Sequence, residues 1–186
     1  MAPRPARGYH KFRNGLLNVK PKGAETQITS NNSEQSPLLT LPAEIRNRIW
    51  GYVVGEKTIV IRWKKFEARD KEKHCHSILR VCRQTYLETA TLPFSLNIFV
   101  FSDDGVIKKL KPYQRENLTQ IQLLIGVGRD DLWMIPSIPS FPKVQLVGIK
   151  CISCGSHVSE ENTRRTEESI KGAYPHAEVT FTWDLP

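Results

Sequence analysis

Two cysteines and a histidine near the C-terminus have the spacing of metal ligands. Cys151 and Cys154 form a C-x-x-C pair, His157 follows three residues later, and the distant segment His74 to His76 could supply a fourth donor. Structural zinc sites need four such donors in a tetrahedral array, commonly from two closely spaced pairs. A single pair falls short of this pattern, and no helix directly follows it as a thioredoxin-like site requires. We therefore expect no cofactor, and a structural zinc at Cys151, Cys154 and His157 is the alternative.

Signatures of the common enzyme classes do not occur in the sequence. It contains no Gly-x-Ser-x-Gly elbow, no Gly-x-x-x-x-Gly-Lys-Ser/Thr phosphate loop and no His-Glu-x-x-His. Residues 126–128 read GVG, a fragment of a dinucleotide fingerprint, but a proline-rich segment follows where a helix would have to hold the pyrophosphate. The acidic pairs at residues 103–104 and 130–131 are explained as helix caps and turn residues. We expect no enzymatic activity.

Positive charge gathers in two segments of the chain. The formal net charge is +8, of which residues 1–36 contribute +4 and residues 62–76 contribute +3. The second segment interleaves aromatic and basic side chains: Trp63, Lys64, Lys65 and Phe66. Such interleaving suits base stacking beside phosphate contacts, although three acids in the same segment would repel phosphate. Nucleic-acid binding through the basic tail and this segment is therefore an alternative function.

The elements that must position these residues alternate between helix and strand. Residues 1–36 are rich in proline, glycine and polar side chains, so we expect a disordered tail there and a single domain over 37–186. Apolar periodicity predicts helices over 42–53, 77–90 and 159–174 and a short helix near 103–110. Composition predicts strands over 58–62, 97–101, 118–125, 144–151 and 178–183, with loops over 62–76 and 127–143. The alternation predicts an α/β (or α+β) fold with a partly parallel or mixed sheet of about five strands and covering helices.

Several large apolar side chains could face either the core or a protein partner. On the first predicted helix Ile45, Ile49 and Val53 share one face that Trp50 widens, and helical spacing of this kind predicts a core face. If exposed, Trp50 would be a natural anchor for a partner. Trp133 and Phe141, in the loop over 127–143, form either a lid on the core or an apolar patch, and we expect a lid. The partner-binding candidates are Ile45, Ile49, Trp50, Trp133 and Phe141.

Three blocks of the sequence resemble a known family. Residues 39–52 read LTLPAEIRNRIWGY, residues 79–90 read LRVCRQTYLETA, and residues 97–101 read NIFVF. In this order the blocks resemble the fungal F-box-like proteins of unknown function. The resemblance implies an F-box-like N-terminal helix that feeds an α/β region, no assigned activity, and docking to a Skp1-type adaptor of a ubiquitin ligase. A strand and a charged loop stand where an F-box has its middle helix.

These observations predict a non-catalytic protein-interaction module, with an F-box-like substrate adaptor as its specific form. No apolar run reaches the roughly 18 residues that cross a bilayer, and the N-terminus has no signal-peptide pattern. Four cysteines are too few for a disulfide scaffold. We therefore expect a cytoplasmic or nuclear protein that has no membrane partner.

Overall fold

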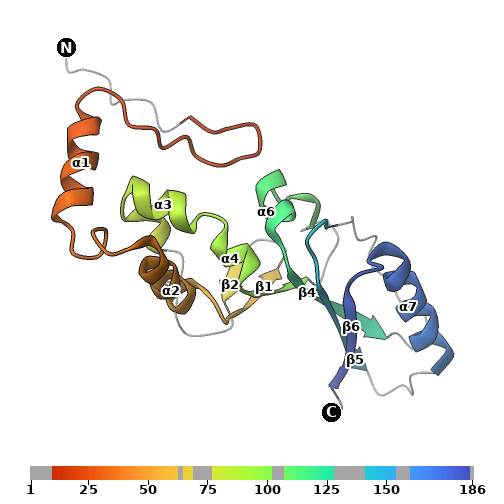
Figure 1. The fold of residues 1–186 in the computed structure, drawn as a ribbon. Helices are drawn as coiled ribbons and strands as arrows, with labels where there is room; N and C mark the ends of the chain where they lie inside the picture. Colours follow the sequence, from red (N-terminus) through yellow and green to blue (C-terminus); the bar gives the residue numbers. More distant parts are fainter. Residues whose placement is uncertain are drawn as a thin grey trace.

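A six-stranded sheet forms the centre of the protein in the computed structural model (Figure 1). The structure describes residues 10–62, 65–68, 77–101, 107–127, 141–153 and 160–184. The strand order is β2-β1-β3-β4-β5-β6, in which β2 pairs antiparallel with β1 and all other neighbours are parallel. The strands are β1 (Thr58–Arg62), β2 (Lys65–Ala68), β3 (Ile98–Phe101), β4 (Gln120–Val127), β5 (Leu146–Ser153) and β6 (Glu178–Asp184).

Helices flank this sheet along its length. They are α1 (Glu25–Gln35), α2 (Ala43–Val54), the 3-10 turn η1 (Ser77–Arg80), α3 (Arg83–Thr89), α4 (Leu92–Ser95), α6 (Pro112–Asn117) and α7 (Glu160–Ala173). Figure 1 shows α1, α2 and α3 gathered at the β1 end of the sheet and α7 beside β5 and β6 at the other end. This arrangement confirms the predicted α/β fold.

The main buried cluster lies on one face of the sheet. Alternate residues of a strand point to opposite faces, and the strand register aligns two apolar rows across the five parallel strands. The rows are Ile59, Phe99, Ile121, Val147 and Val179, and Ile61, Phe101, Leu123, Ile149 and Phe181. Phe94 of α4 and Ile170 of α7 join the same buried cluster, and Tyr113 of α6 packs against it. The helices α4, α6 and α7 thus contribute to the cluster on this face.

The opposite face is mixed along β4, β5 and β6, where the half-buried Leu124 and Leu146 alternate with polar residues. Gln120, Gln122, Lys150, Glu178 and Thr180 occupy it, and none of these side chains is buried. At the other end of the sheet the same face is covered, because Val60 of β1 and Val100 of β3 are buried there.

Most of the predicted elements are confirmed within a few residues. The strand β1 has the predicted bounds, and α2 begins one residue after Pro42, which stands at its N-cap. The predicted helix over 77–90 is wrong, because Val81 and Cys82 interrupt it. Cys82 has an extended backbone, and its thiol accepts a hydrogen bond from the amide of Thr85, 3.4 Å away, so it caps α3 instead of continuing a helix.

Three further differences concern short elements. The loop expected over 62–76 contains β2, which pairs back on β1 with Arg62 opposite Lys65. The helices α4 and α6 are absent from the prediction, and each has a proline in its first turn, where the missing amide donor costs nothing. Much of the helix expected near 103–110 and of the loop over 127–143 lies outside the described residues.

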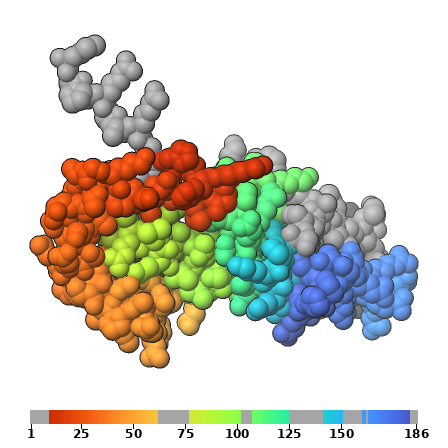
Figure 2. Space-filling view, turned by 45° about the horizontal axis from the view of Figure 1, so that its top comes forward, coloured from red at the N-terminus to blue at the C-terminus, as the bar shows by residue number. Residues whose placement is uncertain are grey.

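The tail expected to be disordered is ordered over residues 10–36. The segment from Phe12 to Lys20 lies across α3 and reaches α6, and Figure 2 shows this red segment on the yellow-green and green parts of the chain. The amide of Leu17 donates to the Tyr86 hydroxyl at 3.0 Å, and the amide of Tyr113 donates to the carbonyl of Asn14 at 3.2 Å. Contacts with residues far along the chain supply this order, and local composition does not reveal them.

Candidate functional site

The outer side of α2 carries four large apolar or aromatic residues that remain in contact with solvent. Ile45, Ile49, Tyr52 and Val53 stand at positions i, i+4, i+7 and i+8, which places them on one side of the helix. Tyr52 is 81% exposed, Ile45 42% and Val53 39%, and Ile49 is half-buried. We call these four residues the α2 stripe. The expectation that Ile45, Ile49 and Val53 mark a core face is wrong for Ile45 and Val53.

The inner side of α2 is fixed to α3 through one carboxylate. Trp50 is 1% exposed, and its indole nitrogen donates to Oε2 of Glu88 at 2.8 Å. Arg46, one turn before Trp50, donates to both Glu88 oxygens, at 2.7 Å from Nη2 and 3.0 Å from Nε. Trp50 is therefore a core residue, and it is not the exposed anchor that a partner-facing tryptophan would be.

Arg46 also holds the chain that leads into α2. Its Nη1 donates to the carbonyl oxygens of Leu39, at 3.1 Å, and of Leu41. Arg46 therefore contacts both the segment that enters α2 and Glu88 of α3. The arginine of the LPAEIR block and the glutamate of the LRVCRQTYLETA block thus serve one junction, where they set the position and direction of α2.

The electrostatics of this junction favour the charged carboxylate. Burial by itself would raise the pKa of Glu88, but hydrogen bonds from Arg46, Trp50 and Gln84 outweigh it and hold the pKa below the ordinary 4.5. In turn, the hydrogen bond to Glu88 raises the pKa of Arg46. Both groups are charged and fully paired at neutral pH, so this site positions α2 and offers no group for proton transfer.

The structure separates the other predicted residues from the α2 stripe. Phe141 is 2% exposed and stacks on Phe101 with ring centroids 6.5 Å apart, so it belongs to the core and cannot bind a partner from there. Trp133, Trp63 and Lys64 lie outside the described residues. Lys65 and Phe66 belong to β2 at the edge of the sheet. Nucleic-acid binding through this segment stays a prediction.

The predicted zinc ligands are only partly described. Cys151 lies in β5, where it pairs with Ile125 of β4 and Trp183 of β6, while Cys154 and His157 lie outside the described residues. In the part of the chain that the structure describes, no three histidine, cysteine or acidic residues gather as a metal site would need. The zinc alternative stays a prediction.

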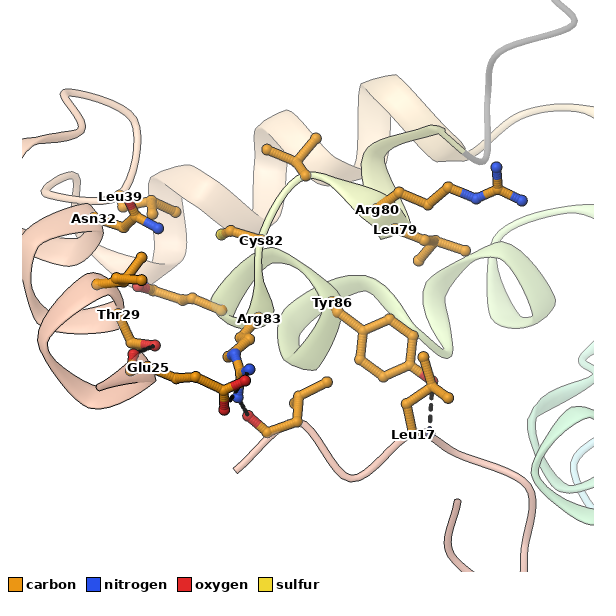
Figure 3. A pocket seen from close by; sticks show the side chains of 14 residues that line it. Leu17, Glu25, Thr29, Asn32, Leu39, Leu79, Arg80, Cys82, Arg83 and Tyr86 are labelled. Carbon is orange, nitrogen blue, oxygen red and sulfur yellow. Dashed lines mark hydrogen bonds and ion pairs between the residues drawn. The ribbon is translucent and has the colours of Figure 1, made fainter. Parts of the chain in front are cut away.

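A groove between α1 and the η1–α3 segment was missed by the sequence reasoning. It has a volume of about 470 Å³, and Figure 3 shows α1 on one side and α3 on the other. Its lining includes Leu17, Val19, Leu39, Leu79, Val81 and Tyr86. The expectation of a disordered tail over 1–36 removed Leu17 and Val19, together with the α1 residues of the lining, from consideration. Leu16 and Leu17, adjacent apolar residues in an otherwise polar tail, were the signal for it.

Comparison with known proteins adds no relative from which a role could be transferred. No family model, curated protein or solved structure matches the chain significantly. Across the described ranges, no helix is both long and apolar enough to cross a bilayer. The geometry of α2 and of the groove is therefore what indicates a role for this chain.

Proposed function

We propose that this protein is a non-catalytic interaction module that docks a partner protein on the α2 stripe, and that the partner is a Skp1-type adaptor of a ubiquitin ligase. One observation carries the proposal: α2 leaves Ile45, Tyr52 and Val53 exposed while its opposite side is fixed to α3. The resemblance of residues 39–52 and 79–90 to F-box-like proteins supports the choice of partner.

The fixed inner side matters because it prepares the helix for binding. Burial of Trp50 and Val54 and the paired Arg46 and Glu88 hold α2 in one position before any partner arrives. A helix that is already ordered loses less entropy on association than a flexible segment does. Apolar side chains at i, i+4, i+7 and i+8 are the pattern with which a helix enters an apolar groove of a partner. An adaptor of this kind would work in the cytoplasm or the nucleus.

Binding of the full-length protein to a purified Skp1-type adaptor, measured by surface plasmon resonance, tests this proposal. Ile45→Asp places a charge within the stripe, and we expect it to weaken binding at least tenfold. Asn47→Asp is the matched control, because Asn47 is exposed on the same helix outside the stripe. We expect it to bind as the wild type does.

Two results would overturn the proposal. One is that the wild-type protein does not bind the adaptor at all. The other is that Ile45→Asp and Asn47→Asp weaken binding equally, which would mean that charge anywhere on α2 matters and the stripe does not. Circular dichroism of both variants should match the wild type, since the substituted residues are exposed.

A further inference from the structure

The helix α1 covers an apolar groove with a polar face. The α1 residues that line the groove are Glu25, Ile28, Thr29 and Asn32, at positions i, i+3, i+4 and i+7. Figure 3 shows Glu25, Thr29 and Asn32 on the side of α1 that is turned toward the groove. A helix that docks into an apolar groove normally carries apolar side chains at this spacing. The only large apolar residue of this set, Ile28, is 61% exposed.

Few contacts hold α1 in place. It buries none of its side chains, and Glu25 forms an ion pair with Arg83 of α3 at 2.8 Å. The Glu25 side chain is 50% exposed, so solvent screens this pair and it contributes little to the stability of α1. A helix of 11 residues with no buried apolar side is marginal in water. The groove beneath it is therefore occupied by a segment that does not fill it.

We propose that this groove binds an amphipathic helix of a partner protein in place of α1, through apolar side chains at the positions of Thr29 and Asn32 and a carboxylate at that of Glu25. The position of α1 demonstrates that a helix fits there. We infer a carboxylate on the partner helix from charge complementarity, because Arg83 pairs with Glu25 and Arg80 lines the same groove. This surface is separate from the α2 stripe, so the inference does not depend on adaptor docking.

A peptide derived from α1 provides the probe. It comprises residues 22–36 with Thr29→Leu and Asn32→Leu, labelled with fluorescein, and its binding to the full-length protein is followed by fluorescence anisotropy. The control peptide carries Gln27→Leu and Asn31→Leu, which add the same two leucines to residues of α1 that do not line the groove. We expect the control peptide to bind at least tenfold more weakly.

Two substitutions in the protein locate the binding surface. Val81 and Leu87 are both exposed apolar residues, at 67% and 69%, but only Val81 lines the groove. We expect Val81→Asp to weaken peptide binding at least tenfold and Leu87→Asp to leave it unchanged. Ile45→Asp should also leave it unchanged, so that failure of the α2 proposal and failure of this one are distinguishable.

If the peptide displaces α1, removal of the Glu25 carboxylate should change peptide binding in opposite directions in the protein and in the peptide. Glu25→Ala in the protein weakens the competing helix and should strengthen peptide binding about threefold, the size expected for one exposed ion pair. The same substitution in the peptide should weaken binding. The inference is overturned if neither peptide binds, if both bind equally, if Val81→Asp and Leu87→Asp act alike, or if Glu25→Ala shifts binding in the same direction in both molecules.

Discussion

The helices α1 and α2 both contact α3, and they differ in the side chains that they turn toward it. The inner side of α2 buries Trp50 and pairs Arg46 with Glu88, while its outer side exposes the α2 stripe. The inner side of α1 presents Thr29 and Asn32 to an apolar groove and buries nothing. Thus α3 supports one fixed helix, α2, and one replaceable helix, α1. The side chains that each helix turns toward α3 make this difference.

The largest expected effect comes from the buried side of α2. Trp50→Ala removes a fully buried indole and should lower the free energy of unfolding by about 3–5 kcal/mol. Tyr52→Ala removes an aromatic ring from the same helix, but that ring is 81% exposed, so the change should stay within about 0.5 kcal/mol. Urea denaturation measures both variants. Similar losses for the two would contradict the assignment of inner and outer sides.

The carboxylate that fixes α2 should make stability depend on pH. Because the pKa of Glu88 is lower in the folded protein than in the unfolded chain, the unfolded chain binds the proton first as the pH falls. The stabilisation is therefore complete above pH 4.5 and is lost as the pH falls through the lower, folded pKa. Urea midpoints of the wild type and Glu88→Gln should differ most near neutral pH and converge in acid. A constant difference would contradict the role of Glu88.

Filling the groove from α1 should stabilise the protein slightly. Thr29→Leu with Asn32→Leu places apolar side chains against the groove and should raise the free energy of unfolding by about 1 kcal/mol. Gln27→Leu with Asn31→Leu adds the same apolar atoms outside the groove and should give no gain. Thermal denaturation compares the two double variants. The first variant should also bind the α1-derived peptide more weakly, because its own helix competes better.

The smallest expected effect concerns the ion pair of Glu25 in α1 with Arg83 in α3. Glu25→Ala should cost about 0.2–1 kcal/mol, and the loss should be local to α1. Amide hydrogen exchange should accelerate across residues 25–35 and stay unchanged in α2. Faster exchange in both helices would mean that α1 and α2 open together, which would remove the distinction between them.

Local patterns in the sequence were sufficient to predict most strands of the sheet and the helix α2. Runs of β-branched and aromatic residues predicted each of the parallel strands, because period-two burial is a property of the strand itself. The helix over 77–90 was predicted as continuous, because Ile78, Leu79 and Tyr86 fit helical spacing. Its interruption depends on the extended backbone of Cys82 and the hydrogen bond that its thiol accepts, which periodicity does not register.

The candidate surfaces were less predictable than the elements. Ile45 and Ile49 were identified as residues for either core or partner, and only the structure separates their exposed side of α2 from Trp50. The groove was missed entirely, because residues 10–36 look disordered when they are considered alone. Their order comes from the hydrogen bond of Leu17 with Tyr86 and the ion pair of Glu25 with Arg83, which join residues 69 and 58 positions apart.

The amino-acid sequence by itself determined which segments become strands and helices, the α/β class of the fold, and the two blocks that meet at the α2–α3 junction. Tertiary structure alone decided which side of α2 is buried. Ile45, Ile49 and Val53 have the spacing of a core face, yet Trp50 turns inward because Glu88, 38 residues later, accepts its hydrogen bond. The physical reason is that the periodicity of apolar residues defines the sides of a helix but not which of them is buried. The element that the fold packs against the helix determines which side is shielded from solvent.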